Sequence, residues 1–65
     1  MSAAENEIFA DIMGRLEAGD NLSIMPTNGG YLAGVLRFGG MGITSGDCPT
    51  LYGALLILLD ELKGR

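Results

Sequence analysis

Apolar residues recur at helical spacing near the start of the chain and later alternate with polar ones. A helix is predicted over 3–18, because apolar side chains return there every three or four positions, at Ile8, Phe9, Ile12, Met13 and Leu16. Ser2 followed three places later by Glu5 has the form of a capping box that starts this helix. Gly19 suits the left-handed residue that ends it, and Gly14 favours a close contact with another helix.

Beyond the first helix the alternation typical of strands takes over. Antiparallel strands are predicted over 21–26 and 31–38, joined through Asn28-Gly29, a dipeptide that supplies the positive φ values of a tight hairpin turn. Pro26 cannot donate a ladder hydrogen bond, so the first strand lies at an edge or ends there. The sequence therefore predicts a β-hairpin behind the helix.

A glycine-rich segment at 39–42 breaks the second strand. The chain then forms either a short third strand over 41–45 or the outgoing limb of a bulge. Pro49 has the fixed φ preferred in the first turn of a helix, which predicts a last helix over 49–63. The whole chain, 1–65, is then a single α+β domain with both helices on one face of an antiparallel sheet.

The last helix carries apolar residues around nearly its whole circumference, and a helix apolar all round must be buried all round. The sheet and the first helix cover two of its faces, and the remaining face is predicted to contact another copy in a dimer or a larger ring. The alternative is that the outward-facing leucines of this helix are ordinary surface residues, which are common on folded proteins and indicate no interface. The residues predicted for this interface are Leu51, Leu55, Leu56, Leu58, Leu59 and Leu62.

The length of the chain also favours self-association. A chain of 65 residues buries little surface when it folds, and such chains usually gain further stability from disulfides, a metal or a partner chain. With one cysteine and no histidine, neither an intramolecular disulfide nor a Cys/His zinc site can form. The net charge of −4 lacks the basic footprint of a protein that binds duplex nucleic acid. The chain start does not resemble a secretory signal, and the longest apolar stretch has six residues, so we expect a cytoplasmic protein without a membrane partner.

The sequence predicts neither an enzyme nor a bound cofactor or metal. Histidine, the commonest general base, is absent, and the carboxylates are spread along the chain. Cys48 precedes a predicted helix start, where the helix dipole favours a reactive thiolate. A buried packing role is the preferred interpretation, since cysteine behaves as a small hydrophobe and no base lies nearby in sequence.

One glycine-rich stretch suggests a ligand site. Glycines allow backbone amides to approach an anion, and a helix N-terminus attracts one, so a small anionic ligand such as a nucleotide signal is an alternative partner, held between subunits. A flexible turn that changes strand direction explains the same glycines. The residues of this candidate site are Tyr31, Arg37, Gly39, Gly40, Gly42, Thr44 and Ser45.

Residues 29–35, Gly-Gly-Tyr-Leu-Ala-Gly-Val, are followed after a gap by Ile-Thr-Ser-Gly-Asp at 43–47 and then by an apolar helix. This order resembles HicB-like antitoxins and implies a small sheet packed by a helix, with a toxin as the partner. The chain departs from that family in its additional first helix and in Cys48-Pro49, where the family has threonine. In size and style it also resembles very small phage-encoded inhibitors of host defence proteins.

These observations predict a non-catalytic, oligomeric binding module that acts stoichiometrically by sequestering its partner. The most specific form of this prediction is a phage-type inhibitor of a host defence protein. A sponge for a nucleotide signal and a toxin-blocking antitoxin are the alternatives.

Overall fold

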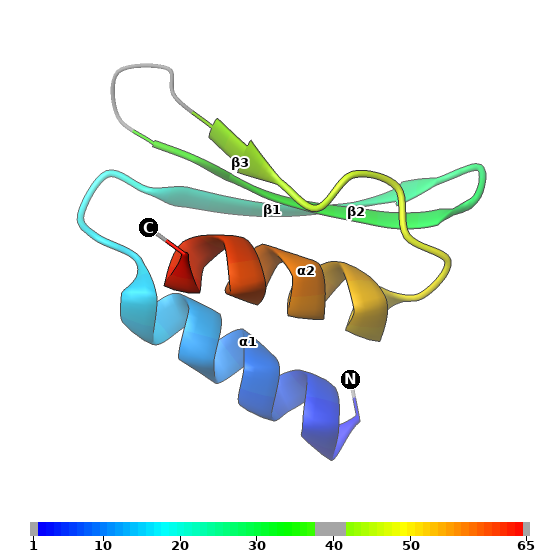
Figure 1. Cartoon of the computed structure of the whole chain (residues 1–65), viewed down its shortest axis with the longest axis horizontal. Coiled ribbons are helices and arrows are strands. Elements are labelled where there is room, and N and C mark those ends of the chain that lie inside the picture. Colours follow the sequence, from blue (N-terminus) through cyan, green and yellow to red (C-terminus); the bar gives the residue numbers. More distant parts are fainter. Residues whose placement is uncertain (1, 38–41, 65) are drawn as a thin grey trace.

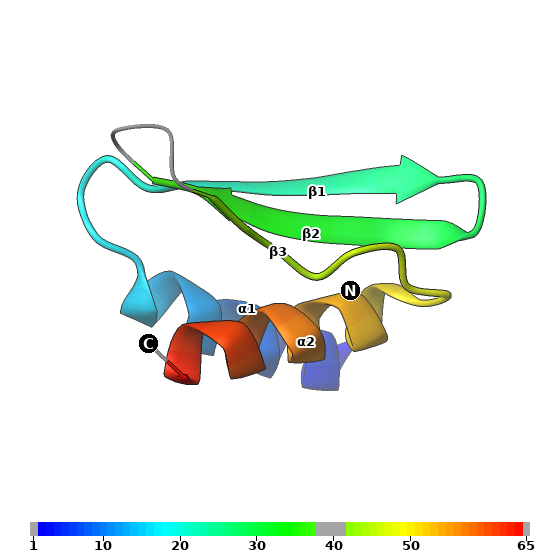
Figure 2. The same ribbon diagram turned by 45° about the horizontal axis from the view of Figure 1, so that its top comes forward.

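The computed structural model of the chain describes residues 2–37 and 42–64 and has two layers. One layer is a three-stranded antiparallel sheet in the order β1-β2-β3, and the other is a pair of helices on one side of it (Figures 1 and 2). The predicted α+β class is confirmed, and of the two alternatives left open after the glycine-rich segment the third strand is the one that forms. The elements are α1 (Ala3–Arg15), β1 (Asn21–Thr27), β2 (Gly30–Leu36), β3 (Gly42–Thr44) and α2 (Leu51–Lys63).

The capping box that starts α1 is present in both directions. The Ser2 hydroxyl accepts a hydrogen bond of 3.1 Å from the Glu5 N–H, and the Glu5 carboxylate accepts one of 2.8 Å from the Ser2 N–H. Two of the backbone donors that a helix start leaves unpaired are thereby satisfied. The same pair of residues that predicted the helix therefore holds its first turn.

The end of α1 comes earlier than predicted, at Arg15 instead of residue 18. Leu16 already has extended backbone, and the Asp20 carboxylate accepts a hydrogen bond of 2.9 Å from the Glu17 N–H. This hydrogen bond from a backbone N–H to a side chain closes a tight turn over residues 17–20, and the turn forms in place of a further turn of α1. Gly19 has the expected positive φ of 94°, but within that turn.

Gly14 does not mark a close helix contact, so that expectation is wrong. The residue is exposed, and a Cβ built on it would meet nothing within 4 Å. The glycine therefore lies on the solvent side of α1, next to the apolar stripe.

Acidification is expected to loosen the first turn of α1. The hydrogen bond from the Ser2 backbone N–H lowers the pKa of Glu5 from its ordinary value of 4.5. A carboxyl with a lowered pKa stabilises the folded state fully above 4.5, and that contribution is lost as the pH falls through the lower folded pKa. Amide hydrogen exchange in residues 3–6 should therefore accelerate below about pH 4.5, beyond its intrinsic pH dependence. Glu5→Gln keeps the acceptor without titrating and should remove this acid-dependent step; an equal step in that variant would assign it to another group.

The sheet register places Asn21 opposite Leu36 and Thr27 opposite Gly30. β1 is an outer strand, which confirms the edge position inferred from Pro26. β1 and β2 differ from the predicted 21–26 and 31–38 by one residue at the hairpin, and β2 ends at Leu36. The predicted end of that strand at residue 38 lies outside the described residues.

The chain between β3 and α2 is tied back to the hairpin end of the sheet. Tyr31 and Cys48 exchange two backbone hydrogen bonds, of 2.7 and 2.8 Å. The helix then begins at Leu51, where the Thr50 hydroxyl accepts a hydrogen bond of 3.0 Å from the Gly53 N–H. Pro49 lies before this N-cap, so its predicted place in the first turn is wrong. The helix begins one residue after Thr50, because the threonine hydroxyl caps a backbone N–H of the first turn.

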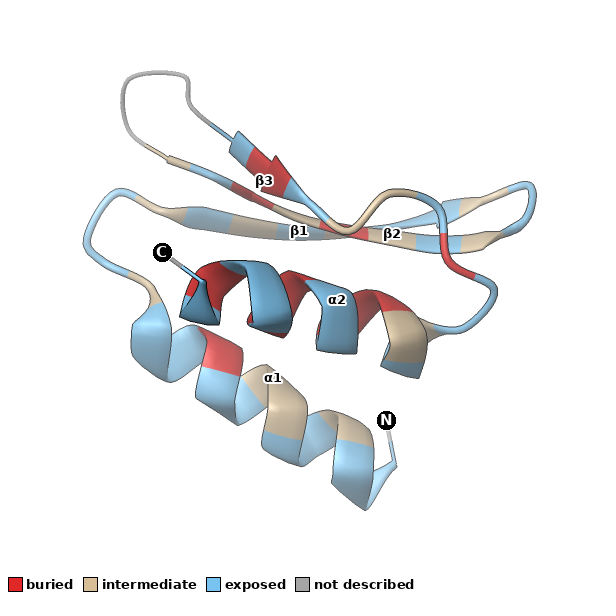
Figure 3. Cartoon of the chain, viewed as in Figure 1, coloured by how far each residue is buried: buried red, intermediate tan, exposed pale blue. Residues whose placement is uncertain are grey.

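α2 supplies half of the core and presents its buried stripe to the sheet and α1 (Figure 3). It is not buried all round, because its outer side chains Tyr52, Leu56 and Ile57 remain 41–45% exposed. The buried apolar residues are Ile12, Ala33, Val35, Ile43, Cys48, Ala54, Leu55, Leu58, Leu59 and Leu62.

The predicted oligomer interface therefore needs correction. Leu55, Leu58, Leu59 and Leu62 lie in the core of the chain itself, where the sheet on one side and α1 on the other cover them. They have almost no surface left for a second subunit. Of the six predicted residues, Leu56 is exposed and Leu51 is half-buried. Within the described residues no helix has the length and apolar character needed to cross a membrane.

Candidate functional site

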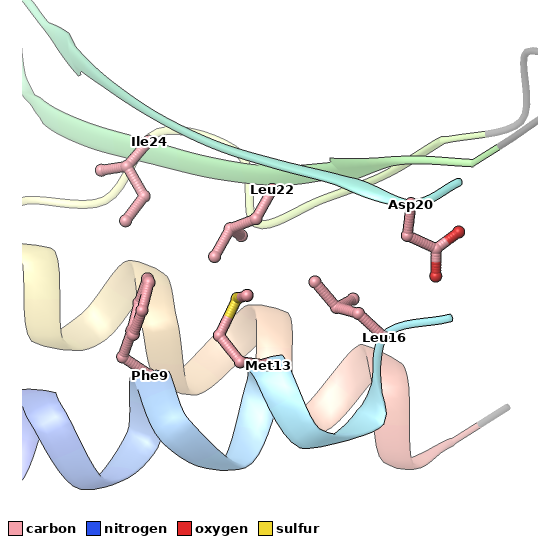
Figure 4. Close-up of a pocket in the computed structure, with 6 residues that line it drawn as sticks. All are labelled: Phe9, Met13, Leu16, Asp20, Leu22 and Ile24. Carbon is pink, nitrogen blue, oxygen red and sulfur yellow. The ribbon is translucent and has the colours of Figure 1, made fainter. Parts of the chain in front are cut away.

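A groove of about 310 Å³ lies between α1 and β1 (Figure 4). Along one wall α1 contributes side chains at helical spacing, and along the other β1 and the residue before it contribute side chains at strand spacing. Five of the six lining residues are apolar. They are Phe9, Met13, Leu16, Asp20, Leu22 and Ile24.

The groove exists because the helices cover the sheet unequally. α2 packs against β2 and β3, whereas α1 packs against α2 and stands beside β1 without sealing against it. Ile12 points into the core and is fully buried, while Met13, one residue on, is 48% exposed at the groove. Leu22 and Ile24 pack against the core on one side and line the groove on the other.

The polar group of the groove is the Asp20 carboxylate, whose side chain is only 5% exposed. It accepts the hydrogen bond from the Glu17 N–H, and the Arg37 guanidinium lies 4.0 Å away, at the limit of an ion pair. A negatively charged group next to an apolar wall favours a ligand with apolar groups and a hydrogen-bond donor or cation at that end.

The outer edge of β1 presents unpaired backbone groups beside this groove. On β2, Tyr31 turns its N–H and C=O toward Cys48, on the β3 side. In an antiparallel strand, successive residues direct their backbone N–H and C=O groups to opposite sides. The even-numbered residues of β2 therefore direct these groups toward β1, where they pair with odd-numbered residues of β1. Leu22, Ile24 and Pro26 therefore direct their backbone groups away from the sheet. No backbone group within 2–37 and 42–64 pairs with them.

The ligand site predicted from the glycine-rich stretch is not gathered in one place. Tyr31 lies near the start of β2 and Arg37 directly follows its end, six residues and therefore about 20 Å apart. Gly42 lies in β3, and Gly39 and Gly40 are outside the described residues. The structure thus separates the aromatic ring from the arginine that the prediction combined.

The two hydroxyl groups of that predicted site serve the fold. The Ser45 hydroxyl donates to the Gly46 carbonyl at 2.8 Å and accepts from the Ala33 N–H at 3.0 Å. The Thr44 hydroxyl accepts from the Gly46 N–H at 3.1 Å. Both hold the chain that leaves β3.

Cys48 has the packing position preferred from its sequence context. It is 4% exposed, and its thiol lies 3.6 Å from the Gly46 carbonyl oxygen, which it faces as a weak donor. Among the described residues no group of three or more cysteine, aspartate or glutamate side chains is placed to hold a metal ion.

Sequence reasoning missed the groove, although a signal for it was present. Phe9 and Met13 belong to the same predicted stripe as Ile8 and Ile12, and this stripe is wider than the surface that α2 alone can cover. The excess width of the stripe is what faces β1. The exposed edge was also implicit in Pro26, because a strand that tolerates proline has one unpaired side.

Comparison with known proteins adds no assignment: no family model, no curated protein and no solved structure matches this chain.

Proposed function

We propose that this chain is a non-catalytic binding module that holds an extended segment of a partner protein along the outer edge of β1. One observation carries the proposal: the unpaired backbone of Leu22 and Ile24 and the apolar groove lined by their side chains lie at the same place. Strand addition uses both features, since the main chain of the segment pairs with the edge and its alternate side chains enter the groove.

The groove has the dimensions of a short extended segment. Along the α1 wall it runs from Phe9 to Leu16, the residue that follows the helix, about 10 Å at 1.5 Å per helical residue. On the other wall it runs from Asp20 to Ile24, about 14 Å at 3.4 Å per strand residue. Three or four residues of a bound strand span this length, and two of their side chains face the groove.

The charges favour a particular kind of segment. Residues 21–27 contain no charged side chain, so an apolar strand approaches β1 without desolvating an ion. At one end the Asp20 carboxylate favours a lysine or arginine of the partner, and the net charge of −4 attracts a basic segment over a longer range. A nucleotide is less suited to this groove, because its phosphates would approach a carboxylate.

Capture of this kind acts stoichiometrically. A segment paired with β1 is withheld from its own protein, which is the mode of action that an inhibitor of a host protein and a toxin-blocking antitoxin share. The proposal therefore keeps the sequestering function expected from the sequence and assigns it to the α1–β1 groove.

A displayed library of random peptides tests the proposal directly. Peptides selected on the wild-type protein should carry apolar residues at alternate positions with a lysine or arginine near one end. Met13→Glu places a carboxylate in the groove and should weaken their binding by about tenfold or more, as burying an unpaired charge does. Selection of peptides without this pattern would contradict strand addition.

Leu56→Glu is the matched control, because Leu56 lies on α2 outside the groove and is 41% exposed, close to the 48% of Met13. The selected peptides should bind this variant as they bind the wild type. Equal losses in the two variants, with both folded by circular dichroism, would assign the binding to general charge and overturn the proposal.

A further inference from the structure

We infer that in the absence of a partner segment the edge of β1 is occupied by β1 of a second copy, so that two chains form one continuous six-stranded sheet and close each other's groove. Such a dimer would block the binding of a partner segment, because the second copy occupies the same site. The inference therefore rests on the proposed function.

The free backbone N–H and C=O groups at the outer edge of β1 can pair with those of a second copy around a twofold axis at Ser23. An antiparallel pair that sets Leu22 opposite Ile24 of the second copy is symmetric, and each of these pairs exchanges two hydrogen bonds. All four free N–H groups of the two edges are then used. Pro26, which has no N–H, falls beyond the pairs at the end of the ladder, where its missing donor costs least.

Charge does not oppose this pairing. Residues 21–27 carry none, and the twofold axis places Asp20 of each copy next to Pro26 of the other, at opposite ends of the ladder. The two carboxylates are then about 20 Å apart by strand spacing, well beyond the screening length of about 8 Å. Two acidic chains can therefore meet along this one edge without direct repulsion.

The edge also lacks the features that usually prevent strands from pairing. Exposed edge strands are commonly protected by charged side chains, by proline or by a covering element. β1 has seven residues, none of them charged, and its one proline lies near the end. Leu22 and Ile24 provide the alternate apolar side chains that the groove of the other copy selects.

The area available predicts a dimer that exchanges with monomer. β1 is about 24 Å long, and the molecule measures 25 Å in the direction from the sheet to the helices (Figure 1), so the face with β1 and α1 covers roughly 600 Å² in projection. Stable interfaces bury about 800 Å² per partner. A contact below that size dissociates readily, and a partner segment with a basic residue at Asp20 gains an ion pair that the second copy does not offer.

Cysteine cross-linking tests the register. Ser23 lies on the twofold axis, where its exposed side chain faces that of the second copy at the spacing of a non-hydrogen-bonded pair, about 4.5 Å between Cα atoms. Ser23→Cys should therefore form a disulfide-linked dimer under mild oxidation. Asn21→Cys is the matched control on the same face of β1, because residue 21 lies opposite Met25 of the second copy and not opposite itself.

Ser23→Cys should cross-link at least about tenfold faster than Asn21→Cys, while Cys48 is buried and leaves the wild type monomeric on a denaturing gel. Equal rates for the two variants would overturn the register. In sedimentation equilibrium the wild type should pass from monomer to dimer as concentration rises toward the millimolar range, and a strict monomer there would overturn the dimer.

Ser23→Glu separates this inference from the proposed function. It brings two like charges together on the axis of the dimer, so dimerisation should weaken by about tenfold or more. A bound peptide meets only one of these glutamates on the outer face, where the added negative charge attracts its basic residue, so selected peptides should bind the variant at least as well as the wild type. Dimerisation without peptide selection would remove the proposed function alone, and peptide binding by a strict monomer would remove this inference alone.

Discussion

Gly30→Ala is expected to leave most of the protein unfolded at room temperature. Gly30 has a φ of +147°, a conformation that L side chains rarely adopt, and it sits where the chain entering α2 crosses the hairpin end. An added Cβ would overlap the Cys48 carbonyl oxygen and lie 2.8 Å from Pro49 Cα, both of them backbone atoms. Such strain costs about 1–3 kcal/mol before the overlap is counted, and a chain of this length has a total stability of roughly 3–10 kcal/mol.

Urea denaturation followed by circular dichroism measures this effect, with Gly29→Ala as the matched control. Gly29 is the neighbouring turn residue, its φ lies outside the positive range, and an added Cβ would meet nothing within 4 Å. The control should therefore differ from the wild type by less than about 1 kcal/mol. If Gly30→Ala unfolded at the same urea concentration as the control, the close approach of the hairpin to Cys48 would be wrong.

Leu55→Ala is expected to lower the free energy of unfolding by about 2–5 kcal/mol, the usual cost of truncating a fully buried leucine. Leu55 is 0% exposed and lies among the core residues that α2 presents to the sheet and α1. Because the whole domain is small, this loss approaches its entire stability. The midpoint of urea unfolding should fall accordingly, with an unchanged slope if the transition stays two-state.

Leu56→Ala, at the adjacent residue, should cost less than about 1 kcal/mol, since Leu56 is 41% exposed and its removal leaves no internal cavity. The pair separates the two positions that the sequence assigned to one intersubunit surface. Similar losses at both residues in dilute protein would mean that α2 is covered on its outer side as well.

The burial of α2 bears on how this small chain reaches stability. Four of the leucines expected to contact another subunit are used within the chain, which reduces the need for a partner at that helix. The surface left incomplete is instead on the opposite flank, where α1 does not close against β1. Self-association, expected from length and composition, is therefore proposed here at a strand edge and not at a helix.

Local features of the sequence were sufficient for the elements. The Ser2–Glu5 box started α1, the helical and strand periods separated the helices from the hairpin, and Pro26 marked an edge strand, because each of these effects acts over a few residues. The end of α1 and the start of α2 were less accurate. There, Asp20 and Thr50 formed side-chain hydrogen bonds that compete with the backbone pattern.

The sequence by itself determined the α+β class, the order of the elements and the absence of charge along β1. Only the tertiary structure decided which apolar residues became core and which became a site. Met13 and Ile12 are neighbours of similar hydrophobicity, yet one lines the groove and the other is fully buried. The reason is physical: periodicity shows that a face is apolar, whereas its burial depends on how closely α1 can approach β1 once α2 has taken its place under β2 and β3.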